Sequence, residues 1–175
     1  MNKKQKKNKL IVICLETTPK AQIDSVYVEN TLKEFYRIES DIKLKYVPMK
    51  SKTLYKDKTT VSKIAKETKD FEWFKVIYCL DTDCIEGSSE AVRLNSQITE
   101  YCESNNIDLV WFCRDIEEVY LGRKVSDNEK IRAAKKFSNS CDISLCSADK
   151  LSSRDLTMGK SNILVIFNEY FQRIR

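Results

Sequence analysis

The stretch KVIYCLDTD at residues 75–83 joins a short apolar run to two acids. A run of this length that is rich in β-branched and aromatic residues is typical of a buried β-strand. A second run, KLIVICL at residues 9–15, has the same character and is followed by Glu16. Continuous apolar strands that alternate with helices are typical of parallel sheets covered on both faces. The two runs therefore predict an α/β fold with a mostly parallel central sheet.

The rest of the chain supplies the alternation that this fold needs. Apolar residues at helical spacing predict helices over 23–40, 61–68, 91–102 and 126–138, and from residue 161 or 162 to the C-terminal residues. Further strands are predicted at 42–46, 108–113 and 142–146. Ser126 and Glu129 have the spacing of a capping box, which marks a helix start. We expect residues 9–175 to form one domain, a Rossmann-like three-layer sandwich in which helices cover both faces of the sheet.

Acids follow the predicted strands at the points where the strands end. Glu16 comes after the first strand, and Asp81 and Asp83 come after the third. Because the carboxyl ends of parallel strands share one edge, where ligands bind, these acids are expected to lie together. Carboxylates are hard oxygen ligands suited to Mg²⁺ or Mn²⁺, so the pattern predicts a divalent-metal site. The alternative is that Asp81 and Asp83 belong to a turn or helix cap while Glu16 is a solvated loop residue.

The segment RDIEE at residues 114–118 follows the fourth strand and brings Glu117 to the same edge. Arg114 in this segment could contact a phosphate, although an ion pair with Asp115 is the simpler use of its charge. The edge would then carry four candidate acids.

The charge of the chain is unevenly distributed along the sequence. Its net charge is +5, and five lysines near the start account for all of it: Lys3, Lys4, Lys6, Lys7 and Lys9. The remaining 26 basic residues balance 26 acidic ones. Residues 1–8 are expected to be a disordered basic arm, which can contact phosphates or simply aid solubility.

Several classes of function are excluded by composition. The chain has no histidine, which rules out Ser-His-Asp and Cys-His catalysis and histidine-bound zinc. Its three glycines cannot form a dinucleotide-binding loop. Seven cysteines without a C-x-x-C pair predict reduced core thiols and a cytoplasmic location. No apolar run approaches the roughly 20 residues of a membrane span, so no membrane association is expected.

A Glu after the first strand and an Asp-x-Asp after the third resemble the Toprim domain of topoisomerases, primases and overcoming-lysogenisation-defect nucleases. The size and the fourth-strand segment are most similar to small RloB-like Toprim proteins, over about residues 9–121. The sequence departs from the family pattern at three places. Thr17 follows Glu16 where the family has glycine, and the glycine after Asp-x-Asp comes one residue late at Gly87. Residues 114–117 keep only the acid of the family's Asn-Pro-x-Phe-Glu element.

The resemblance implies roles for the candidate acids. Asp81 and Asp83 would coordinate Mg²⁺ or Mn²⁺, Glu16 would be a metal ligand or general acid/base, and Glu117 would be an additional catalytic acid. The implied activity is metal-assisted hydrolysis of phosphodiesters in DNA or RNA. It also implies a bacterial defence or toxin–antitoxin setting, with a possible protein partner.

Three other classes fit parts of the pattern. A receiver-like signalling domain also has acids after strands one and three, but it needs a lysine at the end of a fifth strand, and only Lys150 lies nearby. A glycosyltransferase could use Asp-x-Asp, although the chain is short for one. A degenerate Toprim-like subunit that only binds a partner would differ from a nuclease in failing to bind Mg²⁺.

Overall fold

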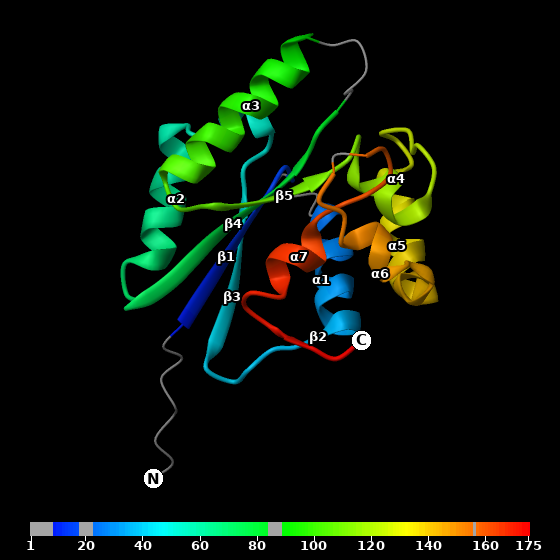
Figure 1. Ribbon diagram of the computed structural model, residues 1–175, viewed down its shortest axis with the longest axis horizontal. Helices are drawn as coiled ribbons and strands as arrows, with labels where there is room; N and C mark the ends of the chain where they lie inside the picture. Colours follow the sequence, from blue (N-terminus) through cyan, green and yellow to red (C-terminus); the bar gives the residue numbers. More distant parts are fainter. Residues whose placement is uncertain (1–8, 18–22, 84–88, 156) are drawn as a thin grey trace.

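A four-stranded parallel sheet lies at the centre of the computed structural model, which describes residues 9–17, 23–83, 89–155 and 157–175 (Figure 1). The strands are β1 (Lys9–Leu15), β3 (Ile42–Pro48), β4 (Trp73–Asp81) and β5 (Asp108–Phe112), in the order β3-β1-β4-β5. All three strand pairs are parallel. The predicted α/β class and parallel sheet are confirmed.

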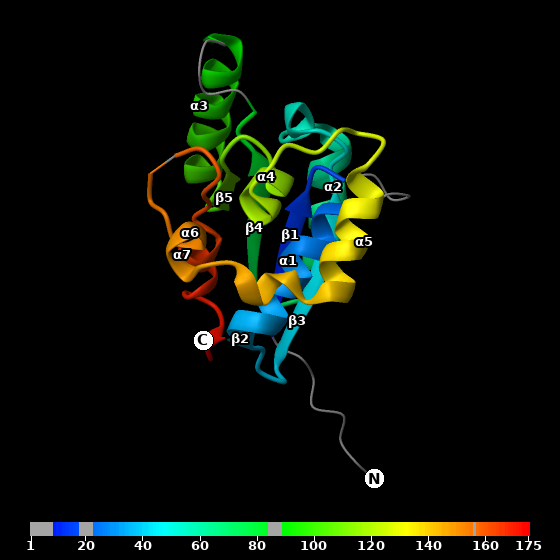
Figure 2. The same cartoon turned by 90° about the vertical axis from the view of Figure 1, so that its right-hand side faces the viewer.

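Helices cover both faces of this sheet (Figures 1 and 2). On one face lie α1 (Ile23–Phe35), α4 (Ile116–Leu121), α5 (Lys130–Ser140), α6 (Ala148–Leu151) and α7 (Ile163–Phe167), and on the other α2 (Lys58–Thr68) and α3 (Ser89–Ser104). Side chains alternate across a strand, so Ile11 and Ile13 of β1 enter the first core while Leu10 and Val12 enter the second. All four are fully buried. The sheet is thus the middle layer of the predicted sandwich.

The strand order fixes where a ligand would bind. From β1 the chain first passes to β3 on one side of β1, and later returns to β4 on the other side. In open parallel sheets, ligands bind beyond the carboxyl ends of the strands at such a reversal. Glu16 follows β1 directly and Asp81 is the last residue of β4. Two of the predicted site residues therefore flank the reversal.

The outer edge of β5 is covered by residues 159–162, which run antiparallel to it. The backbone N–H of Cys113 donates to a carbonyl of this segment at 2.9 Å. The Asn162 side chain completes the pairing, because its Oδ1 accepts from the N–H of Trp111 at 2.8 Å and its Nδ2 donates to the carbonyl of Leu109 at 2.9 Å. The edge strand is thereby supplied with partners for backbone groups that would otherwise be open to other chains.

Two predicted elements near the C-terminal end of the chain are wrong. The strand expected at 142–146 is a 3₁₀ helix, η2 (Asp142–Leu145), where the buried Ile143 and Cys146 are three residues apart and Leu145 is exposed. The helix expected from residue 161 or 162 is the five-residue α7. The chain then turns into β6 (Gln172–Arg173), which pairs antiparallel with β2 (Tyr36–Arg37). That same pairing replaces the last turn of the first predicted helix.

The predicted capping box is wrong, because no side chain among the described residues caps the first turn of α5. The Ser126 hydroxyl donates to the Glu129 carboxylate at 2.5 Å, but α5 begins after Glu129, at Lys130.

Six cysteines in the described part of the chain are free, and five of these are buried. Cys84 and the predicted arm at 1–8 lie outside the described residues. No helix in the described segments is long and apolar enough to cross a membrane.

Candidate functional site at the carboxyl end of the sheet

The carboxylate of Glu16 is held by two backbone amides. Its Oε1 accepts from the N–H of Asp81 at 2.9 Å, and its Oε2 accepts from the N–H of Lys52 at 3.0 Å. Glu16 therefore joins the ends of β1 and β4 to the 3₁₀ helix η1 (Lys52–Leu54), which follows β3. Burial raises the pKa of the Glu16 carboxyl, and the two amide hydrogen bonds oppose this shift. Since an ionised carboxylate offers about four acceptor positions, two remain for a ligand.

Lys52 is a buried lysine whose ammonium group is surrounded by oxygen atoms. Its side chain is only 5% exposed. The Nζ atom lies 2.5 Å from Oδ2 of Asp83, and it donates to the backbone carbonyl of Asp81 at 2.7 Å and to Oδ1 of Asn95 at 3.2 Å. A buried charge is stable only when it is paired and hydrogen-bonded, and all three contacts serve that need. Lys52 thus occupies a cage of three oxygens at the candidate site.

The turn after β4 has an unusual backbone conformation that the end of β5 supports. Asp83 has φ +58° and Arg114 has φ +69°. The N–H of Asp83 donates to the carbonyl of Arg114 at 2.9 Å, and Thr82 Oγ1 accepts from the N–H of Arg114 at 3.0 Å. Residues other than glycine seldom adopt positive φ, and such residues cluster at functional sites. The turn presents the side chain of Asp83, which is 61% exposed, to solvent.

A second group of acids lies on the α1 side of the same edge. Asp24 is in the first turn of α1. Burial, together with the charges of Glu117 and Glu16, raises the pKa of Asp24 to about 7. Burial also raises the pKa of Asp81 well above its usual range, and the charges of Glu16, Asp24 and Glu117 add to the shift. These carboxyls are close enough to oppose one another's ionisation.

Glu117 of α4 is fully buried and faces Lys130, the first residue of α5. Its Oε2 lies 3.2 Å from the Lys130 ammonium. Neither carboxylate oxygen has a hydrogen bond of good geometry within the described residues, and the buried Tyr27 hydroxyl also lacks one. Burial raises the pKa of Glu117, while the charge of Lys130 opposes the shift. Oε1 of Glu117 is therefore a buried oxygen that could accept a cation or a proton donor.

The four predicted acids are not all brought together. Glu16 accepts a hydrogen bond from the backbone of Asp81. Asp83 instead forms an ion pair with Lys52, and Glu117 forms one with Lys130. The chemistry of the donors fits Mg²⁺ or Mn²⁺, since all are carboxylates and, among the described residues, the buried Oε1 of Glu117 has no hydrogen-bond partner. Within the described segments, which omit 84–88, no group of three or more Cys, His, Asp or Glu side chains is arranged to hold a metal ion.

Arg114 does not pair with Asp115, so that expectation is wrong. Its Nε lies 3.0 Å from Oε2 of Glu118. Asp115 is instead the N-cap of α4, where its Oδ1 accepts from the N–H of Glu118 at 2.7 Å. N-cap residues satisfy the free amides of a first helical turn, and this local use took precedence over the ion pair.

Several residues of the site were missed by sequence reasoning: Asp24, Lys52, Asn95 and Lys130. A signal existed for Lys52, because it follows the second predicted strand, whose end must reach the same edge. A weaker signal existed for Asp24, which opens the helix after Glu16. Asn95 and Lys130 carried no local signal, since their roles depend on long-range contacts.

The sequence matches no known protein-family model and no curated protein.

Proposed function

We propose that this protein is a Mg²⁺- or Mn²⁺-dependent phosphodiesterase that hydrolyses nucleic acid, either DNA or RNA. One observation carries the proposal: the Glu16 carboxylate bonds the backbone of Asp81 at 2.9 Å, where β1 and β4 end side by side. This is the position at which open parallel sheets bind ligands. Asp83 follows on a turn whose backbone is held in a rarely adopted conformation.

The roles in the proposed reaction fall to acids. Glu16, Asp81 and Asp83 would hold the ion, which when bound neutralises charge on the phosphate and activates water. Glu16 also keeps the two strand ends in register through its amide hydrogen bonds. Glu117 would be an additional acid, because its buried Oε1 has no partner within the described residues. The absence of histidine supports this assignment, since histidine is the side chain that most often acts as general acid or base near neutral pH.

The Toprim resemblance supports the same activity, and it suggests a cytoplasmic defence or toxin–antitoxin system in which a protein partner takes part. The free, mostly buried cysteines are consistent with a reducing compartment.

A second candidate is a Toprim-like interaction subunit without catalytic activity. One specific observation favours it. Asp83, the most accessible of the proposed ligands, is already neutralised by the Lys52 ammonium at 2.5 Å. Such a pair balances the charge of Asp83 without a metal ion.

Thermal unfolding in the presence of Mn²⁺ tests whether a metal binds. We expect saturating Mn²⁺ to stabilise the wild type by about 2.7 kcal/mol at a hundredfold excess over Kd, because the ion binds only the folded state. Asp83→Asn should lose this shift, and asparagine tolerates the positive φ at this position. Asp41→Asn is the matched control, since Asp41 is a partly exposed acid paired with Lys9 at 3.2 Å, at the opposite end of the sheet.

The same proteins are then assayed for Mn²⁺-dependent nicking of plasmid and for degradation of single-stranded DNA and RNA. The nuclease proposal predicts cleavage by the wild type and the control but none by Asp83→Asn. The absence of both a metal-induced shift and cleavage in the wild type would favour the interaction subunit. Equal metal-induced shifts in all three proteins would rule out this site.

A further inference from the structure

We infer that Lys52 is a built-in cation that competes with a divalent metal ion for Asp83, so that Lys52 sets the metal affinity of the site. The inference rests on the proposed metal site and adds a residue that controls it. Its basis is the oxygen cage around the ammonium group, formed by the Asp83 carboxylate, the Asp81 carbonyl and the Asn95 amide.

The cage has the composition of a site for a hard cation. Carboxylate, backbone carbonyl and side-chain amide oxygens are the ligands that such ions take from proteins. Here the three oxygens lie between 2.5 and 3.2 Å from Nζ, as suits an ammonium hydrogen-bond donor. Asn95 is held in place by its own Nδ2, which donates to the carbonyl of Thr82 at 3.0 Å. The oxygens are therefore fixed by the fold and turned toward a positive charge.

An ammonium and a divalent ion cannot share Asp83 without strong repulsion. Two positive charges a few ångströms apart repel each other, and the burial of the Lys52 side chain limits how far water screens them. The ion must therefore either displace Lys52 or bind only the fraction of molecules in which Lys52 has already moved. In both cases the apparent dissociation constant rises as the fraction that is competent to bind falls.

Removing the ammonium leaves the backbone contact between Lys52 and Glu16 in place. The hydrogen bond from Lys52 to Glu16 uses the backbone N–H, so it persists when the side chain is changed. Methionine has a similar length and suits a buried position, so Lys52→Met removes the charge with the least change in packing. Lys45→Met is the matched control, because it removes one positive charge from a lysine of β3 that pairs with Glu67 at 3.4 Å.

The experiment is a calorimetric titration of the full chain with Mn²⁺. We expect Lys52→Met to bind Mn²⁺ about tenfold more tightly than the wild type, a typical size for coupling between two ligands. Lys45→Met should match the wild type. Adding Asp83→Asn to Lys52→Met should abolish the gain.

A second measurement uses the wild type alone, in case the variant does not fold. Lys52 is 5% exposed and should resist acetylation by a water-soluble reagent, whereas Lys45 is 41% exposed and should react. Saturating Mg²⁺ should increase the acetylation of Lys52, measured by mass spectrometry, and leave that of Lys45 unchanged.

The outcomes separate this inference from the proposed function. Tighter binding by Lys52→Met supports the inference even if the wild type binds no metal, in which case only the proposed metal-dependent activity fails. Equal affinity in the two proteins, with Lys52 still protected from acetylation in saturating Mg²⁺, overturns the inference and leaves the metal site standing. Binding by neither protein overturns both.

Discussion

At the scale of single residues, Glu16 has a structural task in addition to its proposed chemical one. Its two carboxylate oxygens accept hydrogen bonds from the backbone N–H groups of Lys52, which follows β3, and of Asp81, which ends β4. Hydrogen bonds from backbone amides to a carboxylate are stronger than neutral ones. The residue expected to serve as a ligand therefore also fixes the edge on which a ligand would bind.

Glu16→Gln is expected to destabilise the protein. The variant turns one acceptor oxygen into an N–H₂ group that must face a backbone N–H, so one amide loses its partner. We expect the free energy of unfolding to fall by about 1.5–3 kcal/mol, the usual cost of losing a hydrogen bond to a charged group. Urea denaturation measures this change.

Glu39→Gln is the control for this prediction, because Glu39 is exposed and its change should stay within about 0.5 kcal/mol of zero. If Glu16→Gln were as stable as that control, the two hydrogen bonds from backbone amides to Glu16 would contribute nothing to the free energy of unfolding.

The positions of Asp81, Asp83 and Glu16 at one edge were predictable from the sequence, because all three come immediately after apolar runs. The partner of Asp83 was not predictable. Lys52 is one of 31 basic residues, and nothing local distinguishes a lysine that will be buried from one that stays solvated. Only the strand order brings the segment after β3 against the end of β4.

At the scale of elements, the C-terminal helix was predicted to be too long because its apolar pattern continues beyond the helix itself. The apolar spacing of Ile163, Ile166, Phe167 and Tyr170 is helical and continues past Phe167, where α7 ends. The same residues fill the core while the chain turns toward β6, because an apolar pattern records burial and not the backbone's path. Asn162 fixes the start of this segment by bonding β5 with its side chain.

Asn162→Ala should loosen β5. It removes two hydrogen bonds, each contributing about 1 kcal/mol, and leaves the N–H of Trp111 without its acceptor. Amide hydrogen exchange should therefore be faster at Trp111 than in the wild type. Asn139→Ala, at an exposed position of α5, serves as the control. Unchanged exchange at Trp111 would show that the backbone pairing of 159–162 is sufficient by itself.

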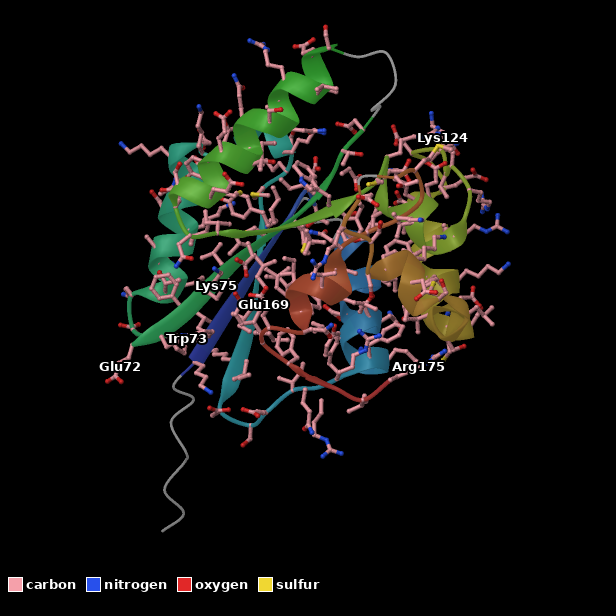
Figure 3. All side chains as sticks on the ribbon, in the orientation of Figure 1. Glu72, Trp73, Lys75, Lys124, Glu169 and Arg175 are labelled. Atoms are coloured by element: carbon pink, nitrogen blue, oxygen red, sulfur yellow. The ribbon has the colours of Figure 1, made fainter. Side chains whose placement is uncertain are left out.

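At the scale of the whole molecule, the balance of charge hides a local excess. Helix α5 carries four basic residues and no acid, and three of the four are exposed: Arg132, Lys135 and Lys136. Arg123 and Lys124 precede this helix and are also exposed. Figure 3 shows Lys124 at the end of the molecule opposite to Trp73, which lies at the amino end of β4. Two basic regions, α5 with its preceding loop and the arm at 1–8, could therefore contact phosphates.

Nucleic-acid affinity is expected to depend more on the arm than on α5. Deleting residues 1–8 removes four lysines, and Lys135→Glu with Lys136→Glu lowers the net charge by the same amount. The deletion should make the slope of log K against log salt concentration less steep by about 0.9 for each phosphate that the arm neutralises. The double substitution should change this slope by less. Fluorescence anisotropy at several salt concentrations measures both slopes. A larger effect of the double substitution would assign the phosphate contacts to α5.

The three-layer architecture was predictable because alternating apolar runs and helical patterns leave few other arrangements. The strand order β3-β1-β4-β5 was not, since no single strand records its neighbours. Asp24 was missed for the same reason, because its place beside Asp81 and Glu117 depends on how three separate elements pack.

The strip at residues 159–162 is synthesised long after the strand that it covers. Until residues 159–162 leave the ribosome, the outer backbone groups of β5 lack the partners that this segment supplies. A nascent chain therefore exposes an unpaired edge strand to other nascent chains on the same mRNA. Such edges invite pairing between chains. The newly made protein should therefore need a chaperone most during the interval between the emergence of β5 and that of Asn162.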